Sequence, residues 1–407
     1  MPKSDLYVGL DVGSTKVAIT CGEIVEGMIN IAGFVKVPNN GVRKGVVVDI
    51  EDTVSSISEA LEKIETISAR RISSAVVGIS GPHIQTSLSK GVVAVARADG
   101  EITPNDVERV IAAARTVALP PNREILHCLP RSFSVDGNEK IEDPVGMTGI
   151  RLEVEALVIS GATGAIKNLT KCIYQAGLDI DDLVFSPLAT AQSLISKKQK
   201  EIGACLLDIG GGTSSIVIFE EGDILHAAVL PVGSGHITND LAIGLRTSVE
   251  TAEKIKIKYA SAIPDKIRES ETISLREFDP GETEKIERKY ISEIVQARLG
   301  EIFSLVSQEL RTVGKDGRLP AGVVLTGGGS KLEDLVEATK ESLRLPAELG
   351  RQSFELGGFV DKLSDPVYAT SVGLMLWGFE HTARGFSGGG GSNLLDKAKG
   401  FFKQFLP

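Results

Sequence analysis

Apolar residues recur along this chain in short runs that predict β-strands, and one arrangement of these runs occurs twice. In the first copy, residues 7–11 form an apolar strand that ends in an acid, Asp11. A turn leads to a second strand over 17–21, and another turn leads to a third strand over 28–35. The pattern predicts a strand–turn–strand–turn–strand unit at the start of the chain.

The second copy of this unit lies in the other half of the chain. Residues 204–208 again form an apolar strand that ends in an acid, Asp208. Strands over 215–219 and 224–230 follow after turns. Two copies of one unit predict two related lobes.

The turn after each acid is rich in glycine and hydroxyl residues. The first turn has Gly13, Ser14, Thr15 and Lys16, and the second has Gly210, Gly211, Gly212 and Thr213. Glycine lets the backbone approach a phosphate closely, and successive N–H groups with hydroxyls bind phosphate oxygens. Two such turns facing each other would clamp a triphosphate between two lobes. For either turn alone, a tight hairpin without a ligand explains the sequence equally well.

The two strand-end acids suit a magnesium ion. Mg²⁺ prefers oxygen ligands and keeps several of its waters. We therefore expect Asp11 and Asp208 to hold Mg²⁺ through water.

A third glycine-rich element follows a buried strand over 321–326 and precedes a predicted helix over 331–342. Its residues are Gly327, Gly328, Gly329 and Ser330. Bare glycine backbone would let a flat nucleoside lie against it. The alternative is an ordinary strand-to-helix turn.

Composition narrows the range of possible functions. The chain has 407 residues, which suits two domains or two lobes, and its formal net charge is −10, which disfavours binding to nucleic acid. The four cysteines are scattered without metal-ligand spacing and are expected to be buried thiols. The start of the chain lacks the pattern of a signal peptide, and no apolar run has the length of a membrane span, so a cytoplasmic protein is expected.

The end of the chain has a different character. Residues 385–392 read as a flexible glycine linker, and 393–407 as an amphipathic helix. Its predicted membrane-binding residues are Leu394, Leu395, Lys397, Lys399, Phe401, Phe402, Lys403, Phe405 and Leu406. The lysines favour anionic lipid. The alternative is a helix that docks on the protein's own core, which would need no free tether.

The three glycine-rich elements, in this order, resemble those of the actin, heat-shock chaperone and sugar-kinase superfamily. The resemblance implies an α/β, actin-like fold of two ribonuclease-H-like lobes with ATP and Mg²⁺ in the cleft between them. Segments 186–191 and 368–373 look like the family's interdomain connectors. In this superfamily a Glu and a Lys three apart on a helix contact ribose and adenine, and Glu253 and Lys256 match them.

Segments 76–81 and 232–242, the latter with Gly235, more particularly resemble the bacterial cell-division family FtsA. This implies a peripheral protein on the cytoplasmic face of the cell membrane at the division septum. It would tether filaments of the tubulin-like protein FtsZ, polymerise on the membrane and help assemble the divisome. Arg298 sits where the family tends to carry a basic residue for the FtsZ C-terminal peptide, although a plain surface arginine is an equal reading.

The resemblance implies the following division of the chain: lobe 1 core (1A) over 1–83 and 156–196, an inserted subdomain (1C) over 84–155, lobe 2 core (2A) over 197–244 and 318–365, a lobe 2 insertion (2B) over 245–317, a return helix to lobe 1 over 366–384, the linker over 385–392 and the membrane-targeting helix over 393–407. Subdomain 1C would contact neighbouring copies and other divisome proteins, and 2B would receive the FtsZ peptide.

Three alternatives share the fold. An FtsA-like ATP-binding pilus-assembly protein generally lacks the linker and the amphipathic tail. A sugar-kinase-like phosphotransferase needs a catalytic Asp and a substrate pocket, for which no clear motif is present. An actin-like chaperone would carry a substrate domain after the ATPase. The sequence leaves the rate of ATP hydrolysis open, and we expect at most a slow ATPase.

Overall fold

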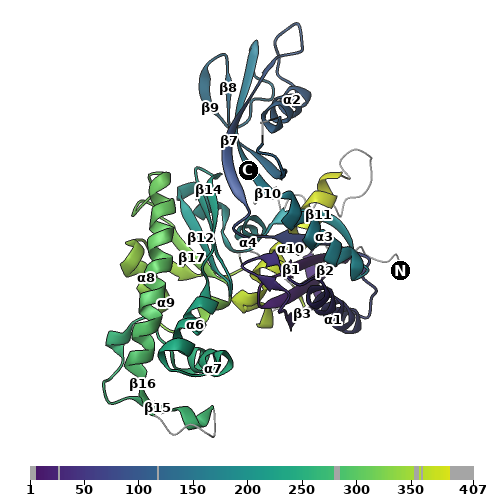
Figure 1. Cartoon of the computed structure of the whole chain (residues 1–407). Coiled ribbons are helices and arrows are strands. Elements are labelled where there is room, and N and C mark those ends of the chain that lie inside the picture. Colours follow the sequence, from purple (N-terminus) through teal and green to yellow (C-terminus); the bar gives the residue numbers. More distant parts are fainter. Residues whose placement is uncertain are drawn as a thin grey trace.

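The structure is a computed structural model that describes residues 6–25, 28–116, 119–278, 285–352, 357–358 and 361–385. It consists of two lobes and an inserted subdomain that projects beyond them (Figure 1). The linker and the predicted membrane helix lie outside the described residues.

The first lobe is built on a six-stranded mixed sheet in the order β11-β6-β1-β2-β3-β19. Its strands are β1 (Leu6–Val12), β2 (Lys16–Val25), β3 (Met28–Pro38), β6 (Ser74–Ile79), β11 (Asp179–Phe185) and β19 (Gly357–Gly358). Strands β1, β2 and β3 are antiparallel neighbours, whereas β6 and β11 run parallel to β1. A small hairpin of β4 (Val42–Arg43) and β5 (Val46–Val47) follows β3.

The second lobe repeats this topology in a five-stranded sheet, β14-β13-β12-β17-β18. Its strands are β12 (Ala204–Ile209), β13 (Ser214–Glu220), β14 (Asp223–Leu230), β17 (Gly322–Thr326) and β18 (Ala347–Leu349). The first three are antiparallel and the last two parallel, as in lobe 1. Because strand order and direction agree between the sheets, the repeat predicted from the sequence is a repeat of fold.

Helices α1 (Ile50–Ser68) and α3 (Thr163–Gln175) pack together on the first lobe. Between the lobes, α4 (Ser186–Leu194) crosses α10 (Ala369–Gly385) closely, since a Cβ on Gly373 would lie 1.9 Å from the Ala189 carbonyl oxygen. The small residues of the two predicted connectors thus permit this crossing.

The inserted subdomain has its own four-stranded antiparallel sheet, β7-β10-β8-β9, with one helix packed on it. Its elements are β7 (Gln85–Ala94), α2 (Pro104–Arg115), β8 (Arg123–Val135), β9 (Asn138–Ile141) and β10 (Arg151–Ala162). Helix α2 starts with a capping box, in which Thr103 and Asp106 satisfy each other's backbone N–H groups. The Thr86 hydroxyl donates to the Ala227 carbonyl at 3.1 Å, which joins this subdomain to lobe 2.

The remaining elements complete lobe 2 and its insertion. They are α5 (Lys197–Ile202), α6 (Ser234–Gly244), α7 (Val249–Tyr259), β15 (Thr272–Ser274), β16 (Lys285–Glu287), α8 (Arg288–Thr312) and α9 (Leu335–Leu343), with short 3₁₀ turns at Pro264–Lys266, Leu275–Glu277, Gly328–Lys331, Asp361–Ser364 and Pro366–Tyr368. No helix in the described ranges has the length and apolarity that crossing a membrane requires. The domain boundaries given above stay a proposal, and β10 crosses the one at residue 155.

One predicted helix differs from the structure. The helix expected over 331–342 begins at Leu335, because Gly328–Lys331 form a 3₁₀ turn. Asp334 then adopts φ 61°, a left-handed conformation that delays the helix start.

Candidate nucleotide site

A cavity of about 530 Å³ lies between the two lobes and is lined by both. Sixteen of the residues predicted for a nucleotide line it: Asp11, Gly13, Ser14, Thr15, Lys16, Asp208, Gly210, Gly211, Gly212, Thr213, Gly235, Glu253, Lys256, Gly327, Gly328 and Gly329. Ser330 does not. It is buried behind the cavity wall, where its hydroxyl donates to the Gly327 carbonyl at 2.8 Å, so it shapes the third turn instead of facing a ligand.

The two predicted phosphate turns have the same geometry. In the first, the Gly13 N–H donates to the Lys16 carbonyl at 2.9 Å. In the second, the Gly210 N–H donates to the Thr213 carbonyl at 2.9 Å.

These turns touch each other across the cavity. A Cβ on Gly211 would lie 2.4 Å from Cγ2 of Thr15, and a Cβ on Gly212 would lie 2.7 Å from Oγ of Ser14. Two glycine-rich turns therefore face one another at close range, an arrangement that only side chains this small permit.

The two strand-end acids, Asp11 and Asp208, line the cavity. Lys16 Nζ pairs with Asp11 Oδ2 at 2.6 Å. Burial raises the pKa of the Asp208 carboxyl to about 6, the charge of Asp11 adds to the rise, and Lys16 opposes it. Two carboxylates that repel each other in a partly buried cleft fit a divalent cation, which would relieve the repulsion.

The donor set also fits magnesium. No group of three or more His, Cys, Asp or Glu side chains is arranged for a metal within the described ranges. Two carboxylates alone leave positions for waters and phosphate oxygens, as Mg²⁺ prefers. When bound, the ion would neutralise phosphate charge beside Asp11 and Asp208.

Helix α6 holds the second turn in place. The N–H groups of Ser234 and Gly235 donate to the carbonyls of Gly210 and Gly211, each at 2.8 Å. A Cβ on Gly235 would lie 2.8 Å from the Gly211 oxygen, so the helix approaches the turn backbone directly. Gly235 therefore supports the turn in addition to lining the cavity.

Glu253 and Lys256 share one face of α7, as their spacing predicts. Lys256 Nζ lies 2.7 Å from Glu253 Oε2 and 2.8 Å from the Thr238 hydroxyl. The Thr238 hydroxyl in turn donates to Glu253 at 2.5 Å. This network fixes both side chains at the cavity wall.

The third glycine element rests on the end of β12. Gly327 has φ 82° and ψ 171°, and a Cβ there would lie 2.2 Å from Asp208 Oδ1. A Cβ on Gly329 would lie 2.5 Å from Cγ2 of Ile209. The turn thus reaches the acid of the second phosphate motif.

Several lining residues have no counterpart among the predicted site residues. Gly45, in the β4–β5 hairpin, donates its N–H to the Ser14 hydroxyl at 2.9 Å. The hydroxyls of Ser80 and Ser215 lie 3.3 Å apart and connect the two lobes. Glu333 also lines the cavity. A Lys-Gly turn between valine-rich pairs indicates the hairpin, but nothing in the sequence places it against the first phosphate turn.

Arg298 is not among the residues that line the cavity. It lies on α8, and its guanidinium pairs with Asp240 of α6 through two contacts of 2.6 and 2.9 Å. This hydrogen-bonded pair raises the pKa of Arg298 above its usual value. The predicted membrane-binding residues lie outside the described part of the chain.

Comparison with known proteins identifies relatives over nearly the whole chain. Residues 205–373 match the model of the family "Cell division protein FtsA", and residues 81–160 match the "SHS2 domain inserted in FTSA". The cell division protein FtsA of Pseudomonas aeruginosa is 41% identical over 94% of this chain and 91% of its own length. Those of Bacillus subtilis and Escherichia coli K12 are 36% and 31% identical, over 84% and 92% of their lengths.

Solved structures with low identity share the fold. A chain of the PilM–PilN type IV pilus biogenesis complex has a TM-score of 0.67 at 17% identity and covers 91% of this chain and 98% of its own. MreB5 of Spiroplasma citri, bound to ADP, has a TM-score of 0.57 at 13% identity and covers 95% of this chain and 100% of its own. These neighbours show the two-lobed, actin-like α/β fold. The identities to the cell-division relatives show that the chain belongs to the FtsA family.

Proposed function

We propose that this chain is an actin-like, ATP-binding cell-division protein that links FtsZ filaments to the inner face of the cytoplasmic membrane. One observation supports nucleotide binding most directly: two glycine turns, each preceded by a strand-end acid, touch across a cavity between the lobes. The relatives named above are cell-division proteins. The fold neighbour MreB5 of Spiroplasma citri holds ADP in one solved structure and AMPPNP in another.

Calorimetric titration with Mg²⁺-ATP tests this part. Asp11→Ala and Asp208→Ala should each weaken binding by more than about tenfold, because a contact to a charged group is worth on the order of 1.5–3 kcal/mol. Asp179→Ala, an exposed acid at the start of β11, is the matched control and should bind as wild type does. Chelation of Mg²⁺ should weaken the wild type to the level of the two variants. Unchanged titrations in both folded variants would remove the assignment.

Two of the three alternative functions that share this fold, the pilus-assembly protein and the sugar-kinase-like enzyme, have less support. The pilus-assembly protein shares the fold at 17% identity, whereas FtsA relatives reach 41%. For a sugar-kinase-like reaction, a coupled assay with ATP and sugars should show no turnover above the slow background. We also propose that the chain hydrolyses ATP at most slowly.

The proposed partner peptide would bind at Arg298. The support is its position on α8 in the 2B region, where its side chain stays 23% exposed although the guanidinium pairs with Asp240 and Glu301. Arg298→Glu should abolish binding of a labelled FtsZ C-terminal peptide in an anisotropy titration. Arg311→Glu, at the end of the same helix, is the control. Equal peptide affinity in both variants would place the peptide elsewhere.

The membrane part rests on the sequence of residues 393–407, whose apolar and basic residues suit an anionic lipid surface. We further propose that the 1C region contacts neighbouring copies and other divisome proteins, in filaments of this chain at the septum. Its support is the match of residues 81–160 to a domain characteristic of the family.

A further inference from the structure

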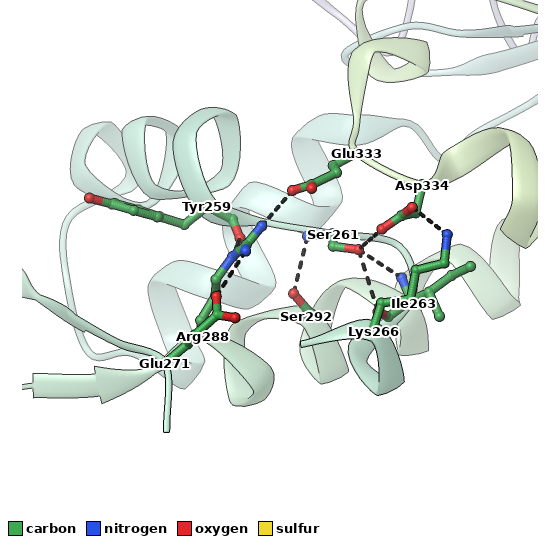
Figure 2. A network of polar contacts seen from close by, with 9 residues as sticks. All are labelled: Tyr259, Ser261, Ile263, Lys266, Glu271, Arg288, Ser292, Glu333 and Asp334. Carbon is green, nitrogen blue, oxygen red and sulfur yellow. Dashed lines mark hydrogen bonds and ion pairs between the residues drawn. The ribbon is translucent and has the colours of Figure 1, made fainter. Parts of the chain in front are cut away.

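Arg288, the first residue of α8, joins three segments that are distant in sequence (Figure 2). Its Nε donates to the Tyr259 carbonyl at 2.8 Å, at the end of α7. Its Nη1 donates to Glu271 at 3.0 Å, and its Nη2 to Glu333 Oε2 at 2.5 Å. We call Tyr259, Glu271, Arg288 and Glu333 the Arg288 cluster.

Through Glu333, the cluster reaches one end of the proposed nucleotide cavity. The wall over residues 327–333 begins beside Asp208, where Gly327 packs, and ends at Glu333. The Ala262 N–H donates to the Glu333 carbonyl at 2.9 Å, so this end is tied to the chain that leaves α7. A nucleotide with its phosphates at the two turns would therefore direct its base toward Glu333.

Apolar groups at this end suit a flat base. Ile257 lines the cavity although its side chain is 75% exposed, and half-buried Leu332 lines it from the opposite segment. The two lysines on this wall are already paired, Lys258 with Glu277 and Lys331 with Asp365. Their charges are thus largely neutralised before any ligand arrives.

Glu333 has unused hydrogen-bonding capacity. Its side chain is 59% exposed, and only Oε2 is engaged, by Arg288. Oε1 makes no hydrogen bond to any residue that the structure describes. A carboxylate oxygen only accepts hydrogen bonds at neutral pH.

We infer that Glu333, held by Arg288, reads position 6 of the base and selects a 6-amino purine over a 6-oxo purine; this inference rests on the proposed nucleotide binding. The amino group of adenine donates to a carboxylate, whereas the keto oxygen of hypoxanthine or guanine repels it. A 6-oxo purine at this position would lose the hydrogen bond to Glu333 and set its keto oxygen against the carboxylate, which lowers its affinity relative to a 6-amino purine. Arg288 acts as a positioning residue, since it fixes the rotamer of Glu333 without touching the base.

The test compares affinities for ATP and inosine triphosphate in the full chain. Wild type should prefer ATP by at least about tenfold. Glu333→Gln should bring the two affinities to within about threefold, because an amide donates as readily as it accepts. Glu341→Gln, an exposed charge-matched change on α9, should keep the wild-type ratio.

Arg288 is tested through the same ratio. Arg288→Gln should lower the ATP preference, and Arg288→Lys should recover part of it, whatever either change does to the melting temperature. If Glu333→Gln keeps the wild-type ratio of ATP affinity to inosine triphosphate affinity, even with both affinities lowered, the inference is overturned. If wild type binds neither nucleotide, the proposed function itself fails, which is a distinct outcome.

Discussion

Gly327 and Gly328 are adjacent in sequence, but only Gly327 is tightly packed by neighbouring atoms. Gly327 lies in a backbone region that is open almost only to glycine, with φ 82° and ψ 171°, and a Cβ there would meet Asp208 at 2.2 Å. A Cβ on Gly328 would meet nothing within 4 Å. Gly327→Ala should therefore cost about 1–3 kcal/mol of unfolding free energy and displace the Asp208 carboxylate, weakening Mg²⁺-ATP binding.

Urea denaturation and ATP titration of the two variants measure this difference. Gly328→Ala is the matched control for stability and should unfold as wild type does; ATP binding is compared with wild type, because Gly328 itself lines the cavity. If Gly327→Ala is as stable as Gly328→Ala and binds ATP as wild type does, the third turn does not support Asp208.

Asp223, at the start of β14, gives a pH-dependent prediction. Burial raises its pKa to about 6, Arg131 of the inserted subdomain opposes the rise, and the acids Glu142, Glu221 and Glu201 add to it. Because the folded state binds this proton more tightly than the unfolded state, its contribution is favourable below about pH 4 and is lost as pH rises through about 6. Asp223→Asn should thus be more stable than wild type at pH 8, by about 1 kcal/mol given its partial exposure.

The measurement is the free energy of unfolding of both proteins from pH 4 to pH 8, with Asp179→Asn as an exposed control. The advantage of Asp223→Asn should shrink toward pH 4. A constant difference across this range would show that another group causes it.

At the residue scale, glycines and strand-end acids were predictable because their chemistry and local spacing carry the signal. Every predicted glycine of the site lines the cavity. Glu333, Ser80 and Gly45 also line the cavity, but the sequence did not predict them, since each reaches it only through the packing of distant segments. Ser330 shows the converse: its place in a motif predicted a ligand contact, but its hydroxyl turns to the Gly327 carbonyl.

Among the elements, the predicted C-terminal helix has the simplest physics. The sequence predicts that Phe401 and Phe405 lie in the apolar sector of this helix. One fully buried Phe covers about 150 Å² or more, which at roughly 25 cal/mol per Å² is just under about 4 kcal/mol as an upper limit. Ordering the helix and incomplete insertion reduce this. Phe401→Glu with Phe405→Glu should therefore release the protein from anionic liposomes and leave ATP affinity unchanged.

Liposome pelleting measures the release. Gln404→Glu adds negative charge on the polar side of the same helix and is the control. Raised salt should weaken wild-type binding, since it screens the lysines. If the double variant pellets as wild type does, the membrane site lies elsewhere in the chain.

Element boundaries were less predictable than element types. The strand repeats were visible as apolar runs between polar turns, but the start of α9 depends on the left-handed conformation of Asp334. Its carboxylate bonds Ser261 at 2.8 Å and Lys266 at 2.6 Å. These tertiary contacts, which the sequence does not reveal, accompany the later helix start.

For the whole molecule, the repeated strand order explains why a cavity exists between the lobes. Each lobe places its glycine turn at the end of its first strand, and α4 and α10 cross between them. The internal echo in the sequence predicted two lobes. The inserted subdomain followed only from resemblance, because its strands carry no repeat and no glycine motif of their own.

The proposed filament formation on a membrane would depend on the cavity, the subdomains and the tail together. A head-to-tail contact that does not close generates filaments, and many tails on one filament would bind lipid with avidity. ATP in the cleft would fix the two lobes in one relative orientation, so that each copy offers the same surfaces to its neighbours.

Electron microscopy of the full chain on anionic vesicles, with and without Mg²⁺-ATP, tests this account most directly. We predict filaments along the vesicle surface with Mg²⁺-ATP, few or none without it, and none for Asp208→Ala. Isolated molecules under all conditions, or filaments that form equally well without nucleotide and in Asp208→Ala, would contradict it.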